Sequence, residues 1–235
     1  MNVCRWFTFC IAALLLVGAS NVARAISPMI SMGEKHGLAL KSDGTVVAWG
    51  SDEFGQLGIG RLTYSTTPSA VLALSSVKAI GTGDNHVLAV KLDGTVWAWG
   101  QNRVYTLGDG TNIDRVNPVQ VMGLTNAIAV SGGLNHSIGL RQDGTVWSWG
   151  NGDSGQLGQG SQTPWAYVPG QCKGLSGITS IAAGRMHNLA LRQDGTVWAW
   201  GWNHYGQLGD GTTIDRSEPV QVQGLSLHVS RMTTV

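Results

Sequence analysis

The feature that most constrains the fold of this chain is a unit of about 50 residues, which occurs four times in its 235 residues. Each copy contains the segment DGTV, and the copies are spaced by 50, 50 and 51 residues. The Asp of this segment is Asp43, Asp93, Asp143 or Asp194. A His precedes it at a constant interval, as His36, His86, His136 and His187. Such a period predicts units that bury their apolar faces only by stacking on one another.

Each copy has the pattern of a β-hairpin around an Asp-Gly turn, as in RQDGTVWSWG (141–150). An Asp-Gly pair predicts a two-residue type I′ turn, which fixes the register of the strands. That register pairs Leu140 with Trp147, Gly139 with Ser148, and Ile138 with Trp149. Because side chains alternate across a strand, we expect one bulky and one small face, neither of them charged. The bulky face of one copy is then expected to pack on the small face of the next.

A Gly-rich loop and a strand led by Pro follow each hairpin, as in PVQVMGL (118–124) and PVQVQGL (219–225). One unit therefore predicts about four short strands. Stacked with a rotation, such units make an all-β fold, a β-propeller with blades of about 50 residues. Four repeats leave three arrangements open: a four-bladed ring, a partial propeller, or a propeller completed by oligomerisation, as in a homodimer.

The repeat itself resembles a known family. GLNHSIGLRQDGTVWSWG (133–150), together with the motifs N-x-x-G-Q-L-G-D-G-T and P-V-Q-V-x-G-L, is similar to the regulator of chromosome condensation repeat over residues 30–225. The resemblance implies a propeller, usually of seven blades, that binds proteins through its rim or loops. Members include a nuclear exchange factor for a small GTPase, a plant ultraviolet photoreceptor and a secreted bacterial inhibitor of β-lactamases. Residues 226–235 lack the Gly-x-x-His and the hairpin, so they predict an incomplete fifth repeat.

The first 25 residues differ from the rest. They combine Arg5, the apolar run CIAALLLVGA (10–19) and the small residues ARA (23–25), which predicts a cleaved signal peptide. The domains are then a signal peptide (1–25), a four-repeat propeller (26–225) and a tail (226–235). We expect an exported protein, secreted or periplasmic, with no membrane insertion after cleavage; a retained anchor is the alternative.

Cleavage would also change the charge and the cysteine count. Residues 1–25 contain two Arg and no acidic residue, so the formal charge falls from +1 to −1. A charge near zero gives no electrostatic basis for binding nucleic acid. Cys172 becomes the single cysteine, which excludes an intrachain disulfide, and it aligns with the core position Val121.

The sequence offers no recognisable catalytic or metal site. One His per unit is spread around the array, whereas metal ligands must converge on one ion; we expect each His to bond backbone within its blade. The segments GDGTNIDR (108–115) and GDGTTIDR (209–216) hold too few acidic residues for a calcium loop. No serine elbow, close carboxylate pair or Cys–His pairing recurs. These observations predict a non-enzymatic protein without cofactor or metal.

Positions at which the copies differ are the better functional candidates, because the fold does not dictate them. Aromatic and Arg side chains on loops are typical anchors of protein interfaces. The partner-binding candidates are Phe54, Arg103, Trp165, Tyr167, Trp202, His204 and Tyr205. Tyr105 and Thr106 replace a Gly and a Gln of the other copies, so we expect a different bend in that loop. The repeated Trp residues of VWAWG are expected in the blade core.

The leading hypothesis is an exported, non-enzymatic propeller that binds an unidentified protein through its non-repeated loop residues. A second is a cell-surface module that binds carbohydrate or accompanies a hydrolase. A third is guanine-nucleotide exchange, against which export argues. A fourth is a truncated gene product without function.

Overall fold

A computed structural model describes residues 26–160 and 164–227, which form sixteen strands in four antiparallel sheets. The first sheet contains β1 (Met29–Met32), β2 (His36–Leu40), β3 (Val46–Gly50) and β4 (Ser65–Ala70). The second contains β5 (Val77–Thr82), β6 (His86–Lys91), β7 (Val96–Gly100) and β8 (Arg115–Gln120). The third contains β9 (Ala127–Gly132), β10 (His136–Arg141), β11 (Val146–Asn151) and β12 (Trp165–Gln171). The fourth contains β13 (Ile178–Ala183), β14 (His187–Arg192), β15 (Thr196–Gly201) and β16 (Arg216–Ser226).

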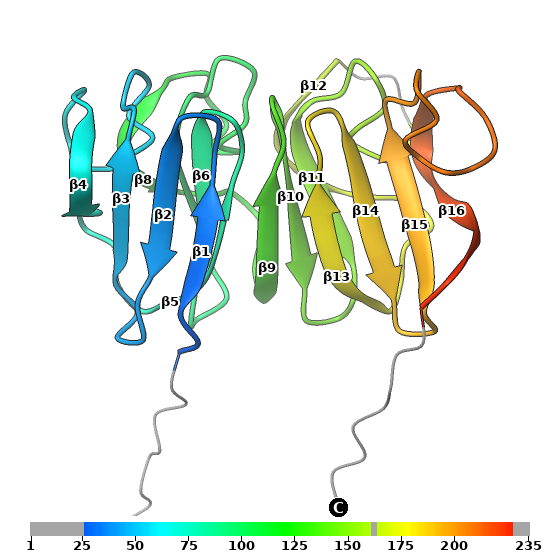
Figure 1. Cartoon of the computed structure of the whole chain (residues 1–235), viewed down its shortest axis with the longest axis horizontal. Helices are drawn as coiled ribbons and strands as arrows, with labels where there is room; N and C mark the ends of the chain where they lie inside the picture. Colours follow the sequence, from blue (N-terminus) through cyan, green and yellow to red (C-terminus); the bar gives the residue numbers. More distant parts are fainter. Residues whose placement is uncertain (1–25, 161–163, 228–235) are drawn as a thin grey trace, which may run out of the picture.

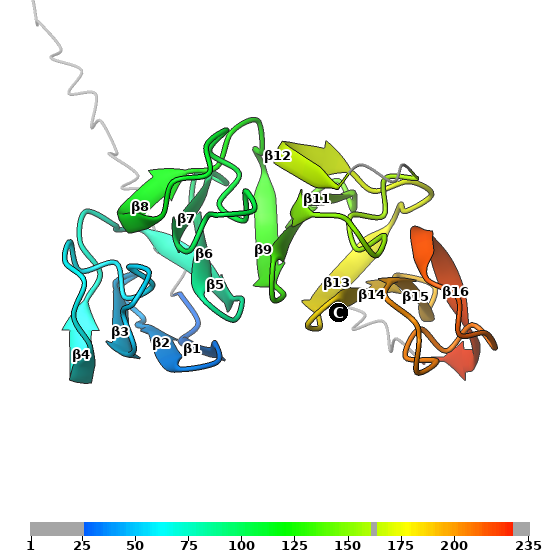
Figure 2. The ribbon, with the colours of Figure 1, turned by 90° about the horizontal axis from the view of Figure 1, so that it is seen from above.

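Each sheet is one repeat, so the predicted all-β, propeller-like architecture of four-stranded blades is confirmed. The first strands of neighbouring blades lie side by side, β1 against β5, β5 against β9, and β9 against β13. The blades stand next to one another in chain order in Figure 1. Seen from above they form an open arc, with β1–β4 at one end and β13–β16 at the other (Figure 2). Nothing in the described residues qualifies as a membrane-spanning helix.

The turn of the hairpin differs from the predicted one. In the third blade Arg141 N donates to the Thr145 carbonyl at 3.0 Å, and Gly144 N donates to the Arg141 carbonyl at 3.0 Å. The loop therefore has three residues, a type I turn followed by Gly144 at φ 77°. The Asp lies outside the positive-φ region in every copy; instead its Oδ1 accepts hydrogen bonds from the Thr two residues later.

This turn shifts the strand register by one residue from the prediction. The observed pairs are Leu140 with Val146, Gly139 with Trp147, Ile138 with Ser148, and Ser137 with Trp149. The predicted division into a bulky and a small face is therefore wrong, because each Trp lies across from a smaller residue. The first blade shows why: a Cβ on Gly37 would lie 2.7 Å from the ring of Trp49, its cross-strand partner.

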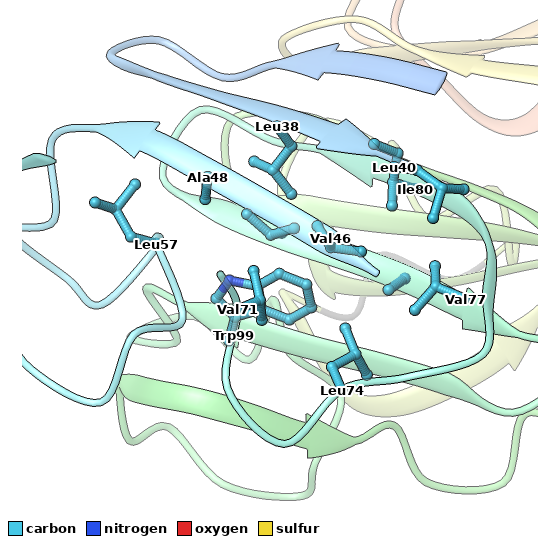
Figure 3. Packing of buried hydrophobic residues seen from close by; sticks show 12 residues of the cluster. Leu38, Leu40, Val46, Ala48, Leu57, Val71, Leu74, Val77, Ile80 and Trp99 are labelled. Carbon is cyan, nitrogen blue, oxygen red and sulfur yellow. The ribbon is translucent and has the colours of Figure 1, made fainter. Parts of the chain in front are cut away.

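The blades still stack, but through faces of different composition. We call the face toward the next blade the leading face and the face toward the preceding blade the trailing face. Leu38, Leu40 and Val46 on the leading face of the first blade pack with Ile80 and Trp99 of the second (Figure 3). Equivalent clusters fill the second and third junctions. The blade core is thus formed between blades, which is why one repeat alone has no core.

One Trp per blade crosses each junction. Trp99, Trp149 and Trp200 are fully buried, as expected for core residues. Their Nε1–H groups donate to the carbonyls of Gln56, Thr106 and Gln156 in the preceding blade, at 3.0, 2.8 and 3.0 Å. Trp97, Trp147 and Trp198 are half-buried, and each lies under a basic side chain, with Arg192 4.2 Å from the ring of Trp198.

The outer strand begins earlier than predicted. β8 starts at Arg115, so Pro118 lies inside the strand rather than at its head. Proline is tolerated there because β8 is an edge strand, with a free N–H side. Cys172 is 1% exposed, which confirms its predicted place in the core, and burial raises the pKa of its thiol to about 12. The predicted signal peptide and residues 228–235 of the predicted tail lie outside the described residues.

Two of the four repeated His side chains, His86 and His136, bond between blades, not to backbone within a blade as predicted. His86 Nε2 lies 2.8 Å from Ser137 Oγ, and His136 Nε2 lies 2.7 Å from Asn188 Oδ1. His36 faces the second blade, where Val87 occupies the equivalent position, and neither of its ring nitrogens has a partner. Burial lowers the pKa of His36 and His136 to about 4, so these rings are neutral.

Candidate protein-binding surface

The loops between the third and fourth strands of the four blades lie along one rim, opposite the Asp-Gly turns (Figure 1). In the first, second and fourth loops a buried side chain at the same position accepts a hydrogen bond from inside the loop. Asp52 Oδ1 accepts from Leu57 N at 2.8 Å, Asn102 Oδ1 from Leu107 N at 2.9 Å, and Asn203 Oδ1 from Leu208 N at 2.9 Å. The first three loops are also bonded to the next blade, as where Gly60 N donates to the Val116 carbonyl at 3.0 Å. The rim is therefore a braced platform on which exposed side chains are held in place.

All seven candidate residues lie in these loops or in β12, and they form three groups. The first group joins the first and second blades. The guanidinium of Arg103 lies 5.5 Å from the ring centroid of Phe54, a cation–π contact. Arg103 is 70% exposed, and its Nε is 3.9 Å from Asp114 Oδ2. The group presents a cation with an apolar base beneath it.

The second group joins the second and third blades and contains a residue outside the candidate set, Tyr105. Its ring lies 4.4 Å from Tyr167 in an edge-on arrangement and 6.4 Å from Trp165. Trp165 and Tyr167 are 46% and 53% exposed. We call these three residues the aromatic triad. Aromatic rings such as these offer a large contact area and lose little conformational entropy on binding.

Tyr105 has an unusual backbone conformation. Its φ is 64°, close to the values of 85°, 80° and 73° at the equivalent Gly55, Gly155 and Gly206. The predicted different bend is therefore wrong at this residue, because its φ lies in the same left-handed region as that of the equivalent glycines, although the side chain is bulky. Left-handed φ costs an ordinary L-residue about 1–2 kcal/mol. Such strain is concentrated at functional sites.

The junction around Tyr105 also departs from its neighbours. A Cβ on Gly55 or Gly155 would come within 2.7 or 2.5 Å of a backbone oxygen in the next blade. The third repeat has one additional residue in the loop that leads to Trp165. Tyr105, the insertion and the two exposed rings of β12 therefore occur together at one junction, and none of them is required by the repeat.

The third group is confined to the fourth blade. Trp202 lies 5.4 Å from the ring of His204 and 5.3 Å from the ring of Tyr205, which is 85% exposed. His204 Nε2 is 3.8 Å from Asp215 Oδ1. Trp202 and Tyr205 also line a largely apolar hollow with Met186, which faces the open end of the arc.

The structure thus brings the candidates onto one rim without merging them into one site. Two criteria from the sequence, the type of the residue and its difference from the other repeats, were sufficient to identify six aromatic or imidazole side chains and Arg103 as rim residues. Tyr105 was missed as a contact residue, although its replacement of a turn glycine was the signal that pointed to it.

The acidic residues of the loops have structural partners. Asp210 Oδ2 accepts from Arg216 Nε at 2.6 Å, and Asp109 Oδ2 accepts from Arg115 Nη2 at 2.8 Å. Burial alone would raise the pKa of Asp210, but hydrogen bonds from Thr212 and Arg216 lower it to about 2. These carboxylates are neutralised by Arg and so are poor calcium ligands. Across residues 26–160 and 164–227, no three His, Cys, Asp or Glu residues cluster as a metal site.

Comparison with known proteins gives a consistent result. The RCC1-like domain family matches residues 20–235. The chain is 41% identical over 58 residues to the ultraviolet-B receptor UVR8 of Arabidopsis thaliana, covering 24% of this chain and 13% of that protein. It is 40% identical over 74 residues to the secretion-regulating guanine nucleotide exchange factor of Mus musculus, covering 32% and 16%.

Solved structures show the same fold. Human WBSCR16 superposes with a TM-score of 0.75 at 26% identity, covering 83% of this chain and 52% of that chain. Yeast RCC1 (Prp20), solved with Kap60, superposes with a TM-score of 0.73 at 24% identity, covering 83% and 48%. The chain therefore spans about half the length of these structures and a smaller share of the curated relatives.

Proposed function

The chain belongs to the RCC1-like domain family, and we propose that it acts as an exported, non-enzymatic propeller that binds another protein through its loop rim. The observation that carries this proposal is the aromatic triad of Tyr105, Trp165 and Tyr167. Its Trp165 and Tyr167 rings are exposed, it has no counterpart at the other junctions, and it is maintained despite a strained backbone at Tyr105.

The character of the rim supports a protein as the ligand. Aromatic and Arg side chains dominate the energy of protein interfaces because they bury a large area with few rotatable bonds. The three groups follow the rim from the first blade to the fourth, a span suited to a macromolecule. Among the described residues, no carboxylate pair in a cleft accompanies the triad, which a glycoside hydrolase would require.

The experiment that tests this proposal is capture of a partner by the immobilised protein from secreted or periplasmic extract. Captured proteins are identified by mass spectrometry, and the Kd of the dominant one is measured with the purified pair. We expect Trp165→Ala and Trp202→Ala each to raise the Kd at least about tenfold. Both side chains lie on the rim, so the melting temperature of each variant should stay close to that of the wild type.

Leu92→Ala is the matched control, because Leu92 is 56% exposed and lies in the turn between β6 and β7 on the opposite rim. This variant should bind the partner as the wild type does. Equal binding by all four proteins would contradict the rim proposal. A loss of binding that parallels a loss of stability in both Trp variants would contradict it as well.

Export is a separate part of the proposal and rests on residues 1–25. If these residues are a cleaved signal peptide, N-terminal sequencing of the protein outside the cytosol should begin at Ile26. Nucleotide exchange, the activity for which one relative is named, is tested by release of labelled nucleotide from candidate GTPases. Stimulated release that survives Trp165→Ala would favour exchange over rim binding.

A further inference from the structure

Within residues 26–160 and 164–227, the two ends of the arc leave two sheet faces without a neighbouring blade. These are the trailing face of the first blade and the leading face of the fourth (Figure 2). The same two kinds of face are covered in all three internal junctions. Each end face can therefore be compared with buried counterparts in the same chain.

The leading face of the fourth blade is apolar, and none of the residues that the structure describes covers it. We call it the tail face, formed by Leu189, Leu191, Val197, Leu225 and Leu227. Leu189 is 38% exposed, and its counterparts Leu38, Leu88 and Ile138 are 0% exposed. Leu225 is 41% exposed, and its counterparts Leu74, Leu124 and Leu175 are 8%, 1% and 4% exposed. A shallow apolar hollow runs along this face between β13, β14 and the end of β16.

The trailing face of the first blade is its apolar complement. We call it the head face, formed by Ile30, Met32, Ala39, Val47 and Trp49. Ile30 and Met32 are 82% and 80% exposed. Of the three counterparts of Ile30, Ile80 and Val130 are 4% and 7% exposed and Ile181 is half-buried. Trp49 is half-buried, unlike the other three junction Trp residues, and its Nε1–H has no acceptor among the described residues.

We propose that a second copy of this chain covers these faces, the tail face of each copy packing on the head face of the other, so that two copies close one ring. The internal junctions carry this inference, because each joins a leading face to a trailing face with the same side-chain arrangement. The tail face is a leading face, which in every internal junction packs on a trailing face. The head face is the one trailing face among the described blades that has no leading face against it. An apolar surface of this kind marks an association site.

The proposal specifies a hydrogen bond across the new junction. In the internal junctions the Trp Nε1–H donates to the carbonyl of residue 56, 106 or 156. The equivalent acceptor in the fourth blade is the Gln207 carbonyl, and the equivalent donor is Trp49. We therefore expect Trp49 Nε1–H to donate to Gln207 of the other copy. His187 would meet Gly37, a residue without a polar side chain, as His36 meets Val87.

A head-to-tail contact either closes into a ring or continues as an open filament, and closure leaves neither apolar face in water.

The test is the solution mass of the purified full chain by light scattering over a range of concentrations, together with two charge variants. Ile30→Glu places a carboxylate on the head face, and Leu189→Glu places one on the tail face. Either variant alone should raise the dimer Kd at least about 100-fold, because each closed ring would bury two unpaired charges. Both residues are exposed in the single chain, so circular dichroism and the melting profile at low concentration should stay close to wild type.

Mixing the two variants gives the most specific result. An Ile30→Glu chain keeps its tail face and a Leu189→Glu chain keeps its head face, so the mixture should form a dimer with one intact junction. Ile113→Glu, at a loop residue 57% exposed and away from both ends, should dimerise as the wild type does. A monomeric wild type, a ladder of higher masses, or dimers formed by either variant alone would overturn the proposed closed pair.

Discussion

At the scale of single residues, Tyr105 is one of four non-glycine residues with positive φ among those that the structure describes, and the one aromatic residue among the four. Its φ of 64° is tolerated by the glycines at the equivalent positions and disfavoured for tyrosine. The ring contacts with Trp165 and Tyr167 offset part of this cost, since aromatic pairs contribute about 0.5–1.5 kcal/mol each. The local structure is therefore a compromise between backbone stability and a cluster of three rings, two of which are exposed.

Two substitutions at this residue separate the backbone strain from the ring. Tyr105→Ala removes the ring and keeps a Cβ at positive φ, whereas Tyr105→Gly removes both. We expect the Gly variant to have a free energy of unfolding about 1 kcal/mol higher than the Ala variant. Urea unfolding measures this difference, and both variants should lose affinity for the rim partner. An Ala variant as stable as the Gly variant would mean that Tyr105 is not strained.

At the scale of strands and sheets, each buried Trp is the element that connects one blade to the next. Trp99 fills the first junction, and its Nε1–H is the donor seen at the Gln56 carbonyl. Trp99→Phe leaves a void and an unpaired buried carbonyl, so it should lower the free energy of unfolding by roughly 2 kcal/mol or more. Trp97→Phe is the control, because Trp97 is half-buried and bonds only to Thr95 beside it; its cost should stay below about 1 kcal/mol. Similar costs in chemical denaturation would show that junction and edge Trp residues are equivalent.

The same scale shows what the sequence could and could not predict. The repeat period, the hairpin and the inward Trp residues followed from pattern alone, because period and polarity reflect the stacking of blades. The strand register could not be predicted in this way, because Asp-Gly is compatible with two turns: a two-residue turn, and a three-residue loop in which only the Gly has positive φ. Asp143 serves the second arrangement through its bond to Thr145, and one residue of slip exchanges the faces of the strand.

At the scale of the whole molecule, the arc shows how local repetition determines the architecture without determining its closure. Each junction is specified by residues of two adjacent blades, so the sequence predicts every junction that has both partners. Whether the first and fourth blades meet depends on the summed rotation of three junctions, which no single motif encodes. The seven rim candidates could likewise be identified from their residue types. Their grouping into three clusters could not, because it depends on which loops the arc brings together.

The repeated His residues couple the stability of the whole arc to pH. Burial is the main cause that lowers the pKa of His36 and His136 to about 4 and that of His86 to about 3, from an ordinary value of 6.5. Between pH 6.5 and these values the unfolded chain binds protons that the folded chain does not. Stability is therefore fully present above about pH 6.5 and falls as the pH is lowered, by about 1.4 kcal/mol per pH unit for each such His.

This acid sensitivity can be assigned to blades by substitution. His136→Gln retains a side chain that can hydrogen-bond to Asn188 and removes the titration, so it should flatten the fall in the free energy of unfolding between pH 6.5 and about 4. In the single chain His187 is less buried because it lies at the end of the arc, so at concentrations where the chain is monomeric His187→Gln should change this slope least. Urea unfolding of the wild type and both variants over the pH range measures the slopes. Equal slopes in all three would mean that other groups set the acid limit. A larger effect of His187→Gln than of His136→Gln would mean that the His187 ring is buried and uncharged, which requires that this end of the arc be covered.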